Sequence, residues 1–312
     1  MGDVSMAEVR RPRRLVAGDR VAVVAPAGPV APERLAAGVE VLRGWGLEVD
    51  LLPGTTGRHE RLTYLAAEDA VRAKEFRAAW LDPSYAAVFC ARGGYGVQRV
   101  LPYLDLAELT AAEPKLLVGF SDITALHEVF NATGIVTVHG PMAATIHQLR
   151  VPQSADRLRQ LLFEPETVTD LLAPAGATTV SGGRASGRLL GGNVALLATS
   201  LGTPTYAPPD GAVVVLEDVG EDAYRLDRLL TQLLRAGWFD GVTGIVLGDF
   251  TETDDPGLAT AVQLERLAPL GIPTVHGAAI GHADLNLAIP LGAPVTLDAD
   301  AGTLTPDGSP LS

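Results

Sequence analysis

Short apolar runs alternate with helix-like segments along the first half of the chain, and this alternation limits the possible folds more than any other feature. Strands that are apolar throughout and separated by helices predict a parallel sheet covered on both faces, which is an α/β fold. Strands are expected at residues 21–25, 47–52, 86–91, 116–120 and 135–138, and helices at residues 32–43, 66–80 and 96–104.

The pattern changes between about residues 153 and 184, where prolines and glycines interrupt a stretch without sustained periodicity. Residues 1–165 are therefore expected to form one domain, residues 166–184 a linker, and residues 185–312 a second, smaller α/β domain. In the second domain we expect helices at residues 194–201 and around 226–234, strands at 212–216, 245–247 and 274–280, and a hairpin of 295–297 with 303–305.

Composition narrows the class of partner. The formal net charge of -13 argues against binding nucleic acid through its phosphates, which an acidic protein repels. No window approaches the roughly 18 apolar residues that a membrane span requires. The first apolar run, residues 21–25, is too short for the core of a signal peptide. These features predict a cytoplasmic protein that binds a small molecule or a peptide.

The single cysteine, Cys90, lies in the apolar run of residues 86–91. One cysteine permits neither an intrachain disulfide nor a zinc site built from cysteines. A strand interior also lacks the cationic neighbour that activates a thiol, so Cys90 is interpreted as a core residue.

Ser121 stands where a buried strand turns directly into a helix. The run of residues 116–120 precedes it, and apolar residues at helical spacing follow from Ile123 to Phe130. At such a turn the free N–H groups and the positive end of the helix dipole point back toward the hydroxyl. This placement suits a nucleophile whose oxyanion is stabilised by the backbone. The alternative is a plain helix cap, and Gly119-x-Ser121-Asp122 lacks the second glycine of the usual elbow.

A serine nucleophile needs a base, most often a histidine, and six histidines are present. His59 lies in a polar loop, His147 on a predicted helix, and His127 on a different face of the helix that follows Ser121. His139, His276 and His282 border strands, where a histidine is often structural. His282 begins a loop of small and polar residues and can face a cleft, but the residues alone leave the choice among these three open.

A carboxylate is also needed to orient the imidazole. Glu217 ends the apolar run of residues 213–216, where a lone buried charge would be costly unless it pairs with a histidine. Asp218 would point to the other side of the strand. Either residue could instead cap the helix that follows.

The glycine cluster Arg92-Gly-Gly-Tyr-Gly96 follows a strand and opens a helix. Such a loop could bind a phosphate, but Arg99 stands where the third glycine of a dinucleotide-binding loop would be. The loop could instead supply a backbone N–H beside Ser121.

Taken together, these motifs resemble those of the LD-carboxypeptidases, the muramoyltetrapeptide carboxypeptidases of serine peptidase family S66. The match runs in order over nearly the whole chain from Val21. It comprises Arg92–Gly96, Val118–Leu126, His139–Pro141, Leu190–Asn193, Leu216–Gly220 with Tyr224–Asp227, and Gly281–His282.

The resemblance implies a Rossmann- or flavodoxin-like N-terminal domain that carries the nucleophile, and a C-terminal domain that carries the other catalytic residues. It implies a catalytic triad of Ser121, Glu217 and His282, and an oxyanion hole from the backbone N–H groups of Gly94 and Asp122, with Gly93 as an alternative to Gly94. It also implies a cytoplasmic, commonly dimeric enzyme without metal or cofactor. Its reaction would release the terminal D-alanine of the murein tetrapeptide during cell-wall recycling.

Two other functions stay open at this stage. The microcin C self-immunity peptidases share the triad but cleave peptidyl or aminoacyl nucleotides, although residues 216–227 look closer to the recycling enzymes. A non-enzymatic or dinucleotide-binding module would keep the glycine loop and have no need of Ser121.

Overall fold

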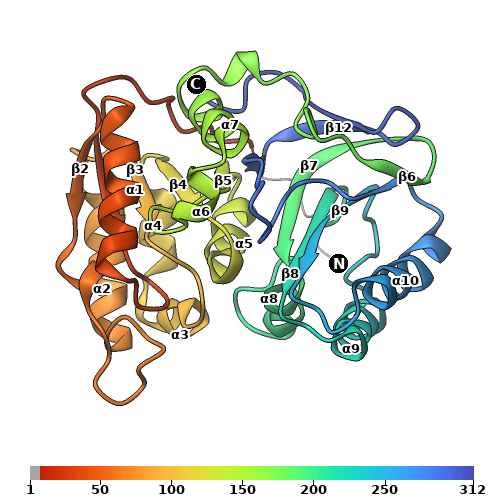
Figure 1. Cartoon of the computed structure of the whole chain (residues 1–312), viewed down its shortest axis with the longest axis horizontal. Helices are drawn as coiled ribbons and strands as arrows, with labels where there is room; N and C mark the ends of the chain where they lie inside the picture. Colours follow the sequence, from red (N-terminus) through yellow and green to blue (C-terminus); the bar gives the residue numbers. More distant parts are fainter. Residues whose placement is uncertain (1–7) are drawn as a thin grey trace.

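The computed structural model describes residues 8–312 and contains two β-sheets, each flanked by helices (Figure 1). In Figure 1 most of the first sheet and its helices are coloured red to yellow-green, and most of the second sheet and its helices are coloured green to blue. The α/β fold predicted from the alternation of apolar runs is therefore confirmed.

The first sheet has six strands in the order β11-β5-β4-β3-β1-β2. The five strands from the first half of the chain pair in parallel, as the pattern predicted, and β11 from the second half joins β5 in the antiparallel direction. The strands are β1 (Arg20–Val24), β2 (Glu48–Leu51), β3 (Ala87–Cys90), β4 (Leu116–Gly119), β5 (Thr137–His139) and β11 (Ile289–Leu291).

Helices cover both faces of this sheet. Successive residues of β1 enter opposite cores: Val21 and Val23 belong to one apolar cluster, and Ala22 and Val24 belong to the other. Helices α1 (Pro32–Gly44), α6 (Ile146–Leu149) and α7 (Pro152–Phe163) contribute to the first cluster; α2 (Asp69–Leu81), α3 (Val97–Val100), α4 (Leu106–Ala111) and α5 (Thr124–Ala132) contribute to the second.

The second sheet has seven strands in the order β13-β12-β7-β8-β9-β10-β6, with β7 to β10 parallel and the outer strands antiparallel. Three helices pack on one of its faces. The elements are β6 (Thr178–Ser181), β7 (Arg184–Asn193), α8 (Val194–Ser200), β8 (Val213–Val219), α9 (Ala223–Arg235), β9 (Gly244–Thr251), α10 (Pro256–Leu267), β10 (Thr274–His276), β12 (Pro294–Asp298) and β13 (Thr303–Pro306).

Several elements differ from those predicted by the sequence pattern. Strand β8 continues through Glu217 and Asp218, so both carboxylates belong to the strand itself. Strand β10 ends at His276, because Gly277 takes a left-handed φ of 82° that interrupts an extended chain. Strand β6 falls within the predicted linker, residues 166–184, and pairs with β10. The division at residues 165 and 185 remains a prediction.

Strand β11 ties the two halves of the molecule together. It comes from the second half of the sequence but extends the first sheet, with Ile289 opposite His139. The chain then turns directly into the second sheet, where Gly292 N donates to Leu189 O at 2.6 Å. The two sheets are therefore joined by continuous hydrogen-bonded backbone and not only by side-chain packing.

Candidate active site

Ser121 lies at a strained turn at the end of β4. Its φ is 65°, a left-handed value that non-glycine residues seldom adopt outside special sites. A short 3₁₀ turn, Ser121–Ile123, separates it from α5. Two residues earlier, a Cβ on Gly119 would lie 2.9 Å from the side chain of Ile123, so the chain can turn this tightly only with glycine there. The strand, turn and helix predicted around Ser121 are all present.

The hydroxyl of Ser121 does not serve as a helix cap. The residue preceding α5 is Ile123, which provides no side-chain cap, and within residues 8–312 Ser121 Oγ forms no hydrogen bond. The side chain is only partly buried. A strained backbone with an uncommitted hydroxyl is the arrangement expected of a nucleophile elbow.

The glycine loop approaches Ser121 through Gly93. A Cβ built on Gly93 would lie 3.0 Å from Ser121 Oγ and 3.2 Å from the backbone N of Asp122, so a larger residue would push into the space beside the hydroxyl. Gly94 adopts a φ of 102°, and a Cβ there would face Gly28 instead. Both glycines thus lie in the loop against Ser121, and the choice between their N–H groups as oxyanion donors remains a prediction.

Asp122 connects this loop to the turn. Its buried carboxylate accepts a hydrogen bond from Val97 N at 2.8 Å, at the start of α3. Burial raises the pKa of Asp122 to about 6, although the Val97 N–H partly offsets the effect. The contact fixes the glycine loop relative to the 3₁₀ turn and thereby fixes the direction of the Asp122 N–H.

Glu217 and His282 form a hydrogen-bonded pair. His282 Nδ1 lies 2.6 Å from Glu217 Oε2; the Glu217 side chain is fully buried and that of His282 is 16% exposed. Burial by itself would raise the pKa of Glu217, but the imidazoles of His282 and His139 lower it to about 2. Burial likewise disfavours the charged form of His282, yet the attraction of Glu217 prevails and raises the pKa of His282.

The loop that carries His282 is held by residues from the first half of the chain. Gln148 Nε2 donates to Gly281 O at 3.0 Å and to Ala283 O at 2.9 Å, so it clamps the backbone on both sides of the histidine. Gly281 has a φ of 136°, and a Cβ there would lie 3.0 Å from Glu217 Oε2. The role of Gln148 was not predicted from the sequence, because a single glutamine on a short helix carries no recognisable motif.

Phe120 connects the turn at Ser121 with the Glu217–His282 pair. Its ring meets the imidazole of His282 edge to face, with the centroids 4.8 Å apart. His282 is thus packed against the residue that directly precedes Ser121. The structure brings Ser121, Glu217 and His282 into one region, with a hydrogen bond between the last two and, among the described residues, none between Ser121 and His282.

The remaining histidines occupy different environments. His127 is buried within α5 and binds Thr137 Oγ1 at 2.8 Å and Gly119 O at 2.9 Å, and burial lowers its pKa to about 3. His139 is also fully buried, and its Nε2 lies 3.9 Å from Glu217 Oε1. His59 Nε2 lies 2.9 Å from Glu68 Oε1, His147 is exposed, and His276 is partly exposed.

Two other acids lie close to Glu217. Asp218 points to the opposite side of β8, as expected, and accepts hydrogen bonds from Asn193 Nδ2 and Ala195 N, each at 2.9 Å, at the start of α8. Asp249, on β9, was not singled out from the sequence; burial and the charge of Glu217 raise its pKa to about 7. Cys90 is fully buried in β3, as predicted, and burial raises its pKa.

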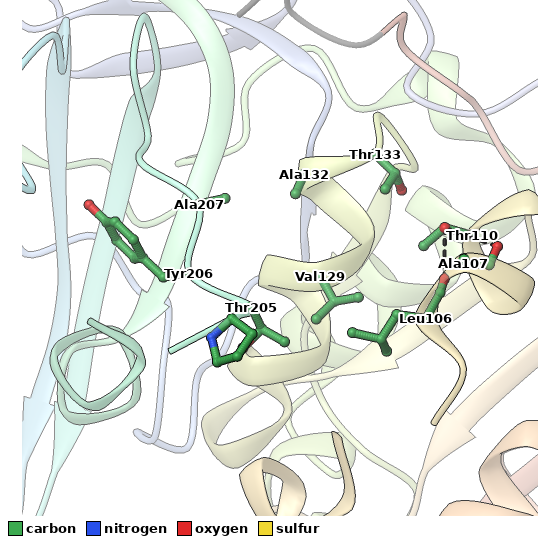
Figure 2. A pocket seen from close by; sticks show the side chains of 10 residues that line it. Leu106, Ala107, Thr110, Val129, Ala132, Thr133, Thr205, Tyr206 and Ala207 are labelled. Carbon is green, nitrogen blue, oxygen red and sulfur yellow. Dashed lines mark hydrogen bonds between the residues drawn. The ribbon is translucent and has the colours of Figure 1, made fainter. Parts of the chain in front are cut away.

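A separate pocket of about 240 Å³ lies at the far end of α5 from Ser121 (Figure 2). Its walls come from α4, from the last turn of α5 and from the segment that precedes β8. Figure 2 shows Leu106 and Val129 lining one part of it, with Tyr206 at another side. None of the candidate catalytic residues lines this pocket.

Residues 8–312 contain no candidate metal site: no group of three or more histidine, cysteine, aspartate or glutamate side chains is arranged there to hold a metal ion. Within the same residues, no helix has the length and apolar character needed to cross a membrane.

The fold and this group of residues define the class of protein, a two-domain α/β peptidase. The chain belongs to the LD-carboxypeptidase family, the S66 peptidases. Residues 21–140 match the model of the LD-carboxypeptidase N-terminal domain, and residues 186–297 match that of the C-terminal domain.

Individual relatives agree with this assignment. The murein tetrapeptide carboxypeptidase of Pseudomonas aeruginosa is 37% identical over 296 residues, covering 90% of this chain and 94% of its own. A Streptomyces coelicolor protein with a provisional carboxypeptidase name is 51% identical over 304 residues, covering 97% of each chain.

Solved structures show the same fold. The muramoyltetrapeptide carboxypeptidase of Oxalobacter formigenes superimposes with a TM-score of 0.77 at 27% identity, covering 92% of this chain and 97% of that one. MccF in complex with glutamyl sulfamoyl guanosine superimposes with a TM-score of 0.87 at 23% identity, covering 97% and 99%. At that identity, the likeness to MccF establishes the fold alone.

Proposed function

We propose that this protein is a serine-type carboxypeptidase that hydrolyses an L–D peptide bond and releases the terminal D-alanine of the murein tetrapeptide. The observation that carries the proposal is the Glu217–His282 hydrogen bond of 2.6 Å beside a strained serine. Relatives more than 30% identical that carry murein carboxypeptidase names support the choice of substrate.

In the proposed reaction His282 acts as general base and then as general acid. Glu217 holds Nδ1 of the imidazole, which leaves Nε2 free to take the proton of Ser121. The Ser121 oxygen attacks the carbonyl carbon, and the tetrahedral oxyanion accepts hydrogen bonds from the N–H groups of Asp122 and of Gly94 or Gly93. His282 then gives its proton to the departing amine of D-alanine. Water, activated by the same imidazole, hydrolyses the ester and restores Ser121.

The wider setting of the proposal is a cytoplasmic enzyme of cell-wall recycling that acts as a homodimer and uses neither a metal ion nor a cofactor. Nucleic acid and membranes are not proposed as partners, given the net charge of -13. Activity unchanged after dialysis against a chelator would support metal independence, and a metal-restored rate would contradict it. Sedimentation at assay concentrations tests the dimer.

The deciding experiment compares two substrates on the purified protein. We expect release of D-alanine from murein tetrapeptide and little hydrolysis of an aminoacyl sulfamoyl adenosine, the kind of compound on which a self-immunity peptidase would act. The second candidate is favoured only by the fold shared with MccF. Preference for the sulfamoyl compound would reverse the assignment. Turnover retained in Ser121→Ala would instead favour a mechanism, or a binding role, without the serine.

The pH dependence provides a second test. His282 must be neutral to accept the proton of Ser121, and its pKa is raised by Glu217. We therefore expect kcat/KM to fall as the pH decreases through a value above the ordinary histidine pKa of about 6.5. An acid limb well below that value would show that His282 is not the base, or that Glu217 is not ionised beside it.

A further inference from the structure

His139 is a buried histidine to which the proposed reaction gives no task. It is the last residue of β5, next to Gly119 in the sheet, and is fully buried. Within residues 8–312 neither of its ring nitrogens has a hydrogen-bond partner. An imidazole always carries at least one N–H donor, and burying that donor without an acceptor is unfavourable.

The polar atom that faces His139 belongs to Glu217. Oε1 of Glu217, the oxygen that does not bind His282, is buried and also lacks a hydrogen-bond partner among the described residues. It lies 3.9 Å from His139 Nε2. This separation is about 1 Å longer than a hydrogen bond, so a small shift of either side chain would satisfy both atoms at once.

The surroundings favour such a shift over solvation by water. Both side chains have 0% exposure. The ring of Phe120 lies 5.6 Å from the centroid of His139 and 4.8 Å from that of His282, so it packs against both imidazoles. Any movement of the Ser121 turn therefore reaches both histidines that flank Glu217.

We propose that His139 is a positioning residue: with its proton on Nε2, it donates to Glu217 Oε1 and fixes the carboxylate that orients His282. The inference rests on the proposed function, in which His282 is the base. Each oxygen of Glu217 then binds one imidazole, His282 from the second half of the chain and His139 from the first. The carboxylate cannot rotate away from His282, and it stays ionised although it is fully buried.

His127 shows what a purely structural histidine looks like in the same core. Both of its nitrogens are hydrogen-bonded, to Thr137 and to Gly119 O, and its ring centroid lies 6.4 Å from that of His139. His127 therefore needs no partner from the site, whereas His139 has no hydrogen bond among the described residues and lies 3.9 Å from Glu217 Oε1. The other charged or titratable groups that act on the Glu217–His282 pair are Asp218 on β8, Asp249 on β9, Glu252 after β9 and His147 on α6.

The test uses a matched pair of amides. In His139→Gln the side-chain N–H₂ can occupy the place of Nε2 and reach Glu217, whereas in His139→Asn it lies near the place of Nδ1 and cannot. We expect kcat/KM to fall about 10- to 100-fold in His139→Asn, the loss of one hydrogen bond to a charged group, and to stay within a few-fold of the native value in His139→Gln.

The pH profile separates positioning from mere packing. Without the hydrogen bond from His139, the negative charge of Glu217 is less stabilised, and its attraction for a proton on His282 is stronger. The pKa at which the Glu217–His282 pair takes up its first proton should therefore rise. The acid limb of kcat/KM is thus expected to move upward by about one pH unit in His139→Asn and to return toward the native position in His139→Gln. The same shift should appear in the rate at which a fluorophosphonate labels Ser121, a readout that does not depend on the natural substrate.

His127→Gln serves as the control for loss of a buried histidine. It should lower the melting temperature without moving the acid limb, because His127 does not contact Glu217. The inference is overturned if His139→Gln and His139→Asn give equal rates and the native acid limb, or if nitrogen NMR of the native protein places the His139 proton on Nδ1 alone. Failure to release D-alanine while Ser121 is still labelled with the expected pH dependence would reject the proposed substrate and leave the inference standing.

Discussion

The two halves of the candidate site are built in different ways. Ser121 depends on local structure: a buried strand, a glycine that permits the turn, and a helix that begins three residues later. Glu217 and His282 depend on contacts between distant segments: they are 65 positions apart in sequence, and Gln148 from the other half of the chain clamps the histidine loop. The conformation of Ser121 therefore follows from its neighbours in sequence, whereas the Glu217–His282 pair forms only when distant segments have packed together.

The largest expected effect comes from removing the groups that react. Ser121→Ala and His282→Ala should each lower kcat by about 10⁴- to 10⁶-fold, because both proton transfer and covalent catalysis are lost. The side chain of Ser121 is partly exposed and forms no hydrogen bond among the described residues, so the melting temperature of Ser121→Ala should stay close to the native value. His282→Ala leaves the fully buried Glu217 without its 2.6 Å partner, so its melting temperature should fall while the fold is kept. Unfolding of either variant would show that the residue supports the core instead.

Glu217→Gln tests the Glu217–His282 pair, the part of the site that is formed by long-range contacts. The amide can present N–H₂ to Nδ1 of His282 and force the wrong tautomer, so kcat should fall by about 10⁴-fold. Glu217 is fully buried, and the variant should therefore also change the melting temperature, unlike Ser121→Ala. A rate near that of the native protein would remove Glu217 from the proposed triad.

Gln148→Ala tests the clamp between the halves. It removes two hydrogen bonds to the backbone on either side of His282 and leaves two carbonyl groups to find other partners. We expect the free energy of unfolding to fall by about 1–3 kcal/mol and kcat/KM by roughly tenfold, with the labelling of Ser121 slowed to a similar extent. If activity is lost without any slowing of Ser121 labelling, Gln148 contacts the substrate instead.

The smallest expected effect is an increase in stability. Ser121 holds a φ of 65° that glycine adopts freely, so Ser121→Gly should be more stable than Ser121→Ala by about 1 kcal/mol, although both are inactive. Both variants lack the hydroxyl, so the difference between their melting temperatures reports the backbone strain and not the loss of that group. Equal melting temperatures would mean that the turn stores no strain.

The sequence predicted the first sheet well because its evidence is local. Apolar runs and helical spacing indicated β1 to β5 and α1 within a residue or two, and the turn at Ser121 followed from the same pattern. Strand β11 could not be predicted in this way, because three residues with a central proline have no recognisable period. Its position depends on pairing with β5, some 150 residues earlier in the chain.

The choice of histidine illustrates the same limit. His139, His276 and His282 all border strands, and their local sequences do not rank them. Only the fold shows that His282 binds Glu217, that His139 faces the other oxygen of the same carboxylate, and that His276 lies on β10 without either contact. The packing of segments that are distant in sequence thus determines which histidine binds Glu217, and the local sequence pattern does not indicate it.

Strand β11 also limits how a substrate can enter. The His282 loop leads within a few residues into β11, which is hydrogen-bonded to β5 of the first sheet. The two sheets therefore cannot move apart without breaking the β11–β5 pairing or the backbone hydrogen bond from Gly292 to Leu189. We expect access by movement of loops instead, while the amide protons of Ile289 and Leu291 stay equally protected from exchange with and without substrate. Faster exchange at those two amides on binding would show that the two sheets do separate.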